Sequence, residues 1–374
     1  MRRKSRWFTA EVRPDKNVAE SPYTNMPQVW HALTMILDRD ANRFDFMRLL
    51  AAWLVLVSHC YPLGARPEQE PLASTLGLDT LGGVGVSIFF VLSGYLVTLS
   101  LERSQSLLAF ARKRAVRIFP GLLVVCLLSV CILGPILTTL PLDSYWQNGQ
   151  TWTYLKTISA WSIQYALPGV FENTPLPNAV NGSLWSLPYE LRCYIFLMLV
   201  GVLPGGLRWK TLFVFAALIV LLLARPAVPP ATAFDKFFGL DHFMNKLGLL
   251  FALGALFAAW REFFQPRLWQ VLIFAALLTF VPPSKARLLF FLLTTGVLTL
   301  WLALSARYLP KIPQRMGDWS YGAYLYGFVV QQILATLRLH EYNFFLFMGL
   351  SSLLTLALAG MSWHLVEKPA LRWK

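Results

Sequence analysis

The stretch "RLLAAWLVLVSHCYP", residues 48–62, has the composition of a membrane-buried helix but carries an ionisable group near each end. Arg48 opens it, and His59 follows eleven residues later among apolar side chains. Eleven residues of α-helix make about three turns and rise about 16 Å, so the two side chains fall on nearly the same face. Ionisable groups inside apolar spans usually mark functional sites. The stretch therefore predicts a transmembrane helix with a functional face; a histidine bonded only to backbone or water is the structural alternative.

The rest of the chain has the composition of a membrane protein. Of 374 residues, 56% are hydrophobic and only 14% are charged, against about 25% charged in soluble domains. Apolar runs near the length of a bilayer-crossing helix recur along the sequence, which predicts an all-α, polytopic integral membrane protein with about ten transmembrane helices. The predicted spans are 46–63, 84–101, 119–139, 185–203, 211–224, 243–260, 268–282, 287–306, 318–337 and 343–366.

The distribution of positive charge predicts the orientation of these spans. With ten spans and an N-terminus inside, 24 of the 33 lysines and arginines fall on cytoplasmic segments and seven on outer loops. This bias follows the positive-inside rule, so both termini are predicted to be cytoplasmic. Topology therefore accounts for the net charge of +14, and the absence of a soluble basic domain argues against nucleic acid as a partner.

The chain divides into three predicted parts. Residues 1–42 form a polar, basic cytoplasmic tail without the apolar core of a cleavable signal peptide, residues 43–368 form the membrane domain, and residues 369–374 form a short cytoplasmic tail. A long outer loop, 140–184, contains "TWTYLKTISAWSIQYALPG", for which we expect an interfacial or re-entrant helix. The four cysteines lack metal-site spacing, so no metal is expected.

Glu190 is the second candidate, in "NGSLWSLPYELRCY", residues 181–194. It falls just inside a predicted span, at the outer end and at about the depth expected for His59. A buried carboxylate needs a partner, and His59 and Arg192 are the two candidates. The structural alternative is an ion pair that only locks two helices.

Two further stretches carry candidate residues. In "FARKRAVRIFPG", residues 110–121, Arg114 and Arg117 are three apart and share a face if the segment is helical. They suit either positive-inside anchoring or the binding of a phosphate. In "GGVGVSIFFVLSGYLV", residues 82–97, the glycines predict close helix packing, and Ser93 and Tyr95 can bond each other or a ligand.

Taken in order, these stretches resemble the type-3 membrane acyltransferase family over residues 43 to 370. The similarity is carried by "DFMRLLAAWLVLVSH" with Asp45, Arg48 and His59, by "FFVLSGYL", by Arg114 and Arg117 before Phe119-Pro120, by "NGSLWSLPYE" ending at Glu190, by "WSYGAYLY" at 319–326 and by "VEKP" at 366–369. The family often has a histidine after the motif written "YLY" here, where this chain has Gly327.

The resemblance implies an O-acyltransferase of the bacterial inner membrane that moves acyl groups, usually acetyl, from acyl-CoA (acetyl-CoA) to a hydroxyl of an extracytoplasmic carbohydrate such as O-antigen or exopolysaccharide. His59 would be the general base, and Glu190 would orient it. Arg48, Arg114 and Arg117 would bind the acyl-CoA. The residues expected to contact substrate or support the site are Asp45, Ser93, Tyr95, Asn181, Ser183 and Trp185.

Two other classes of protein fit the same physical features. A transporter or flippase of a glycan or lipid-linked precursor also has many spans and a few buried charges, although the sequence lacks the two related halves common in transporters. A membrane-embedded sensor or interaction protein would show no turnover. The identity of the acceptor, the length of the acyl group, direct transfer as against an acyl-enzyme, and the oligomeric state stay open.

Overall fold

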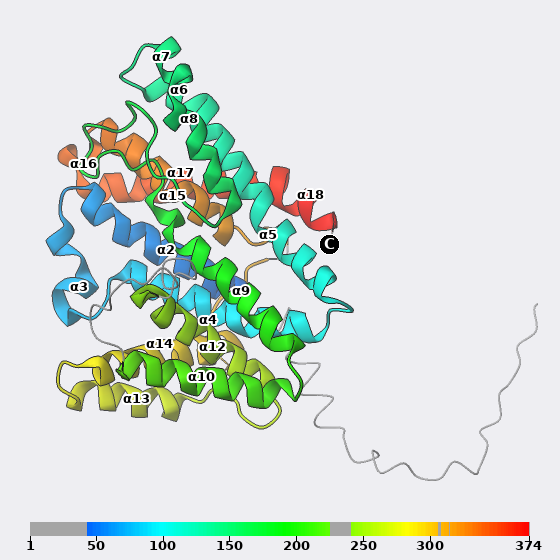
Figure 1. The fold of residues 1–374 in the computed structure, drawn as a ribbon. Helices are drawn as coiled ribbons and strands as arrows, with labels where there is room; N and C mark the ends of the chain where they lie inside the picture. Colours follow the sequence, from blue (N-terminus) through cyan, green and yellow to red (C-terminus); the bar gives the residue numbers. More distant parts are fainter. Residues whose placement is uncertain (1–42, 225–240, 306–307, 314, 374) are drawn as a thin grey trace, which may run out of the picture. The chain divides into compact units, whose positions relative to one another are not determined.

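The computed structural model describes residues 43–224, 241–305, 308–313 and 315–373, and those residues contain helices and no strand (Figure 1). They belong to one unit of the chain, residues 42–374. The predicted N-terminal tail, 1–42, lies outside the described residues.

Each of the ten predicted spans overlaps a helix. These helices are α2 (Phe44–Leu63), α4 (Leu81–Glu102), α5 (Leu107–Leu128), α9 (Leu187–Val202), α10 (Leu207–Ala224), α12 (His242–Ala259), α13 (Leu268–Phe280), α14 (Lys285–Ser305), α15 (Ser320–Thr336) and α17 (Phe344–Ser362). Seven helices within the described residues are long and apolar enough to cross a membrane, whereas α9, α13 and α15 are shorter. The chain is therefore a helical multi-pass membrane protein, and the number ten and the orientation stay predictions.

Short helical elements join or extend these ten helices. Two of the long helices continue through π-helical turns, η2 (Ser129–Leu133) after α5 and η5 (Trp363–Glu367) after α17. The other short elements are η1 (Pro67–Gln69), α3 (Pro71–Leu76), α6 (Gly134–Leu137), α7 (Leu142–Gln147), α8 (Gly149–Thr153), η3 (Tyr154–Ser159), η4 (Gly182–Ser186), α16 (Leu339–Tyr342), α18 (Lys368–Ala370) and η6 (Leu371–Trp373).

Helix α4 packs between α2 and α12 (Figure 1). Glycine permits the close approach: a Cβ at Gly94 would lie 2.0 Å from the carbonyl oxygen of Phe251, and one at Gly254 would lie 2.1 Å from that of Val91. Small residues let helix backbones meet in this way in membranes. The prediction that the glycine-rich stretch serves helix packing is therefore confirmed at Gly94.

Substituting Gly94 with alanine is expected to destabilise the protein by about 1–3 kcal/mol, because the new methyl group meets a backbone carbonyl that cannot move without separating α4 from α12. The apparent melting temperature in detergent measures the loss. Gly349→Ala is the matched control, since a Cβ there has no neighbour within 4 Å. Equal melting temperatures for Gly94→Ala and the unsubstituted protein would contradict the packing argument.

Contacts between α2 and α4 show which residues of the two helices lie at the same level of the bundle. The two helices run antiparallel: the Phe44 and Tyr95 rings are 5.5 Å apart at one end, and a Cβ at Gly82 would lie 3.0 Å from the Ser58 hydroxyl at the other. Ser93, near Tyr95, is therefore level with the first turns of α2. His59 is about 12 residues further along α2, on the order of 18 Å away by helix rise.

The predicted helix over 151–169 forms only in its first half, residues 151–159. Short turns, α8 and η3, end at Ala160, which has a left-handed φ of 54°. The Thr157 hydroxyl then accepts a hydrogen bond from the Gln164 amide at 2.9 Å, which closes a turn instead of continuing a helix. Regular structure resumes at η4, which leads directly into α9.

Candidate active site

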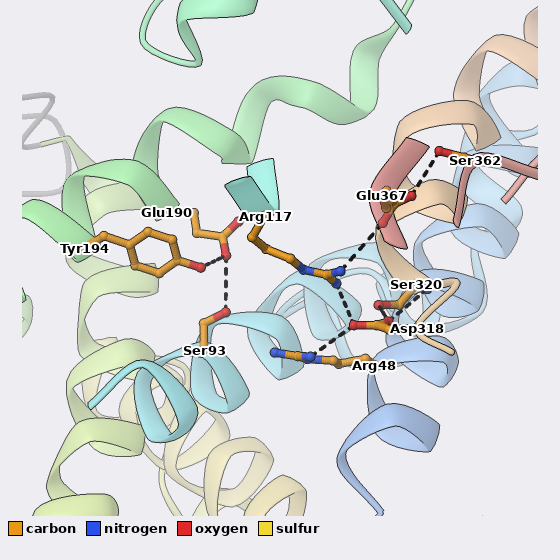
Figure 2. Close-up of polar contacts among 9 residues, drawn as sticks. All are labelled: Arg48, Ser93, Arg117, Glu190, Tyr194, Asp318, Ser320, Ser362 and Glu367. Carbon is orange, nitrogen blue, oxygen red and sulfur yellow. Dashed lines mark hydrogen bonds and ion pairs between the residues drawn. The ribbon is translucent and has the colours of Figure 1, made fainter. Parts of the chain in front are cut away.

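Two arginines meet one carboxylate at the N-terminal end of α2 (Figure 2). Asp318 Oδ2 lies 3.1 Å from Nη1 of Arg48 and 2.5 Å from Nη2 of Arg117. Arg117 also faces Glu367, with 3.6 Å between its Nη1 and the Glu367 Oε2. Residues from α2, α5, the segment before α15 and η5 thus form one ionic cluster, which we call the inner cluster: Arg48, Arg117, Asp318 and Glu367.

Neighbouring hydroxyls hold both carboxylates of the inner cluster in place. Asp318 Oδ1 accepts hydrogen bonds from the hydroxyl and the backbone amide of Ser320, and Glu367 Oε1 accepts one from the Ser362 hydroxyl at 3.0 Å. The Glu367 side chain is only 3% exposed, whereas that of Arg117 is 21% exposed. The carboxylates are therefore packed into the protein, and the guanidiniums keep some accessible surface.

Arg114 is arranged differently from the other two arginines. Its Nη2 donates weakly to the Ser100 hydroxyl at 3.4 Å, and its Nε has no hydrogen-bond partner within the part of the chain that the structure describes. It lies close enough to Glu190 and Arg48 for direct charge–charge interaction. Among the three predicted anion-binding arginines, Arg114 alone makes no salt bridge to a described carboxylate, so its charge is not neutralised by a direct partner in the described residues.

Glu190 lies near the inner cluster, not near His59. Its Oε1 accepts a hydrogen bond from the Ser93 hydroxyl at 3.2 Å and a second from the Tyr194 hydroxyl (Figure 2). Because Ser93 is level with the first turns of α2, the Glu190 carboxylate lies at about the depth of Arg48. The expected pairing of Glu190 with His59 is therefore absent, and the expected equal depth is wrong. The 3₁₀ turn η4 carries the chain from the level of His59 toward that of Arg48 before α9 begins.

His59 contacts the segment that leads into α9. Its Nδ1 lies 3.5 Å from the Ser183 hydroxyl, and its ring meets Phe328 edge-on with 5.3 Å between the ring centroids. Ser183 is in η4, next to Asn181, whose side-chain amide donates to the carbonyl of Leu325 at 2.8 Å. This bond ties η4 to α15. The predicted supporting residue Ser183 thus lies beside His59, and Asn181 holds the turn that carries Ser183.

The remaining predicted site residues are spread out. Asp45 is exposed in the first turn of α2. Tyr95 is 1% exposed and stacks on Phe44, so it is a packing residue. Trp185 is half-buried against Phe243, with 4.9 Å between ring centroids. Arg192, the other candidate partner of Glu190, instead faces the ring of Trp161 at 4.9 Å.

Sequence reasoning missed Asp318 as a member of the cluster, although it opens the predicted span 318–337. An acidic residue at the start of an apolar run is the signal that would have found it. Glu367 was noted only within "VEKP". No group of three or more potential metal ligands occurs in the described ranges.

The sequence matches a family model described as an acyltransferase domain over residues 42–364. It is 31% identical to an "O-acetyl transferase" of Shigella phage Sf6 over 331 residues, which cover 88% of this chain and 95% of that protein. It is 29% identical to "Nodulation protein 10" of Rhizobium leguminosarum bv. viciae, covering 88% of this chain and 93% of the relative. "Acyltransferase MdmB" of Streptomyces mycarofaciens matches at 28% over half of this chain. No solved structure matches significantly.

Proposed function

Because the chain belongs to this acyltransferase family, we propose that it is an O-acetyltransferase that uses cytoplasmic acetyl-CoA and a hydroxyl of an extracytoplasmic carbohydrate, such as O-antigen or exopolysaccharide. The acyltransferase activity follows from the family. The donor, the acceptor, the bacterial inner membrane and the cytoplasmic termini belong to the proposal.

The observation that carries the proposal is the separation of two kinds of chemistry along α2. Guanidiniums gather at its N-terminal end, where Arg48 joins Arg117 and Arg114 lies nearby. An imidazole beside a hydroxyl lies about 16 Å further on, at His59 and Ser183. Guanidiniums bind phosphate well, and an imidazole suits proton transfer near neutral pH. This spacing suits a donor whose phosphates lie at one end and whose thioester reaches the other.

In the proposed reaction His59 takes the proton of the acceptor hydroxyl as its oxygen attacks the thioester carbonyl. The carbon–sulfur bond then breaks, and the CoA thiolate takes the proton from the imidazolium. Ser183 contacts Nδ1, so it orients the ring and leaves Nε2 as the atom that handles the proton. Direct transfer needs no acyl-enzyme, and neither Ser93 nor Tyr95 lies at the depth of His59.

Glu190 takes a different role from the one expected. Since it lies level with Arg48 and not near His59, we assign it to the donor end, where the hydroxyls of Ser93 and Tyr194 hold its carboxylate.

The test is transfer by the purified protein in lipid vesicles with radiolabelled acetyl-CoA and a candidate glycan acceptor. Label on the glycan supports the enzyme. Transport of unmodified glycan without any acetylation would favour the flippase alternative, and no turnover at all would favour a sensor.

Arg114→Ala is expected to raise KM for acetyl-CoA by about tenfold or more, because a charge-assisted hydrogen bond to phosphate contributes about 1.5–3 kcal/mol. The KM for the acceptor should not change. Arg112→Ala is the matched control, since Arg112 is exposed on the same helix. Equal donor KM values for the two variants would remove Arg114 from the donor site.

A further inference from the structure

A row of hydroxyl groups starts at His59 and runs toward the inner cluster. Element η4 is a 3₁₀ helix, in which side chains three residues apart are eclipsed, so Ser183 and Ser186 share one face. Ser183 contacts His59 at 3.5 Å. The Ser186 hydroxyl lies 3.2 Å from the hydroxyl of Tyr324 on α15. One turn of η4 therefore presents two hydroxyls in line, with the imidazole at one end.

Aromatic rings continue this row to the guanidiniums. The rings of Tyr324 and Tyr321 are nearly parallel, with centroids 6.4 Å apart. Arg117 lies over the Tyr321 ring at 5.5 Å. The Ser186–Tyr324 pair thus lies between the His59 end and the inner end of the proposed site.

The hydrogen-bonding capacity of this pair is not exhausted. Tyr321 is occupied, because its hydroxyl donates to the carbonyl of Ile118 at 2.7 Å. Ser186 and Tyr324 share one hydrogen bond, which leaves one O–H donor and several lone pairs. Tyr324 and His59 are only partly buried, so both keep surface that a ligand can contact. Polar groups among apolar helices are costly and usually have a function.

The donor supplies groups that match this capacity. The pantetheine arm of acyl-CoA carries two amides, each with an N–H donor and a carbonyl acceptor, between its phosphates and its thioester. An amide moved from water into an apolar bundle needs partners for both groups. A pair of hydroxyls with one free donor and free lone pairs provides them.

We propose that Ser186 and Tyr324 hydrogen-bond an amide of the pantetheine arm and so position the thioester at His59. This inference rests on the proposed function. It adds two residues that bind the donor at a point distinct from the phosphate-binding arginines.

The test measures steady-state kinetics of Tyr324→Phe and Ser186→Ala with three donors: acetyl-CoA, acetyl-pantetheine, which keeps both amides but lacks the nucleotide, and S-acetyl-mercaptoethanol, which has no amide. The expected result is a five- to tenfold higher KM for acetyl-CoA, an equal rise for acetyl-pantetheine, and no change for the amide-free donor. The KM for the acceptor should stay within twofold. Tyr342→Phe, at an exposed tyrosine, is the matched control.

Two results would overturn the inference. The first is unchanged KM for both amide-bearing donors in both variants. The second is an equal loss with the amide-free donor, which would mean that the hydroxyls only support the local fold. If Ser186→Ala does not accumulate in membranes, Tyr324→Phe, which keeps the ring, decides alone. Failure of the unsubstituted protein to use acetyl-CoA would instead overturn the proposed function, and this inference with it.

Discussion

Replacing His59 with alanine is expected to lower the rate of acetyl transfer by about 10²–10⁴-fold, the usual contribution of a general acid–base group. His59 is the candidate base because the Ser183 hydroxyl contacts its Nδ1 and can orient the ring. His59 also lies at a different level of the bundle from the inner cluster, where the donor phosphates are proposed to bind. No carboxylate hydrogen-bonds to His59 within the described residues. The initial rate of label transfer from acetyl-CoA to the glycan measures the effect.

The controls for His59→Ala separate chemistry from folding. The variant should reach the membrane at the level of the unsubstituted protein and keep its donor affinity, since the phosphates are expected to bind at the other end of α2. Ser183→Ala should lower the rate less, by about tenfold, because it removes one orienting contact and leaves the imidazole. A His59→Ala variant with an undiminished rate would remove His59 as the general base.

Replacing Arg117 with alanine is expected to destabilise the protein by about 3–5 kcal/mol, the cost of removing one partner from a buried ion pair. Asp318 would retain Arg48, but Glu367, which is 3% exposed, would lose its only salt bridge among the described residues. The apparent melting temperature in detergent should fall sharply. Arg114→Ala should leave it nearly unchanged, because no described carboxylate depends on Arg114.

A double substitution that also removes the Glu367 charge tests whether the unpaired carboxylate causes the loss of stability. In Arg117→Met combined with Glu367→Gln, the uncompensated charge is gone and Arg48 still pairs with Asp318, so most of the lost stability should return. Donor binding should stay weaker than in the unsubstituted protein, since one of the guanidiniums proposed to bind the donor phosphates is missing. If Arg117→Ala melts at the same temperature as the unsubstituted protein, the inner cluster is not a structural ion network.

Some features of this fold depend on local sequence patterns, and others depend on contacts between distant segments. The positions of the ten helices followed from apolar runs, because each run must satisfy its own backbone hydrogen bonds within one helix. The contact between glycine-rich α4 and its neighbours was also foreseen at Gly94. The structure of the loop 140–184 was not predictable in the same way, since Ala160 ends the expected helix with a left-handed turn that the apolar pattern does not encode.

The sequence by itself determined that this is a helical membrane protein, that its residues match an acyltransferase family, and which ionisable groups its spans carry. Only the tertiary structure decided which of those groups meet. The sequence predicts Glu190 level with His59 if its helix starts at the membrane surface, whereas η4 leads the chain away from His59 and α9 places Glu190 beside Ser93. Asp318 likewise meets Arg48 and Arg117 from some 200 or more residues away. Helix periodicity determines the face on which a side chain lies, but depth and partner depend on how separate helices pack, which no local pattern records.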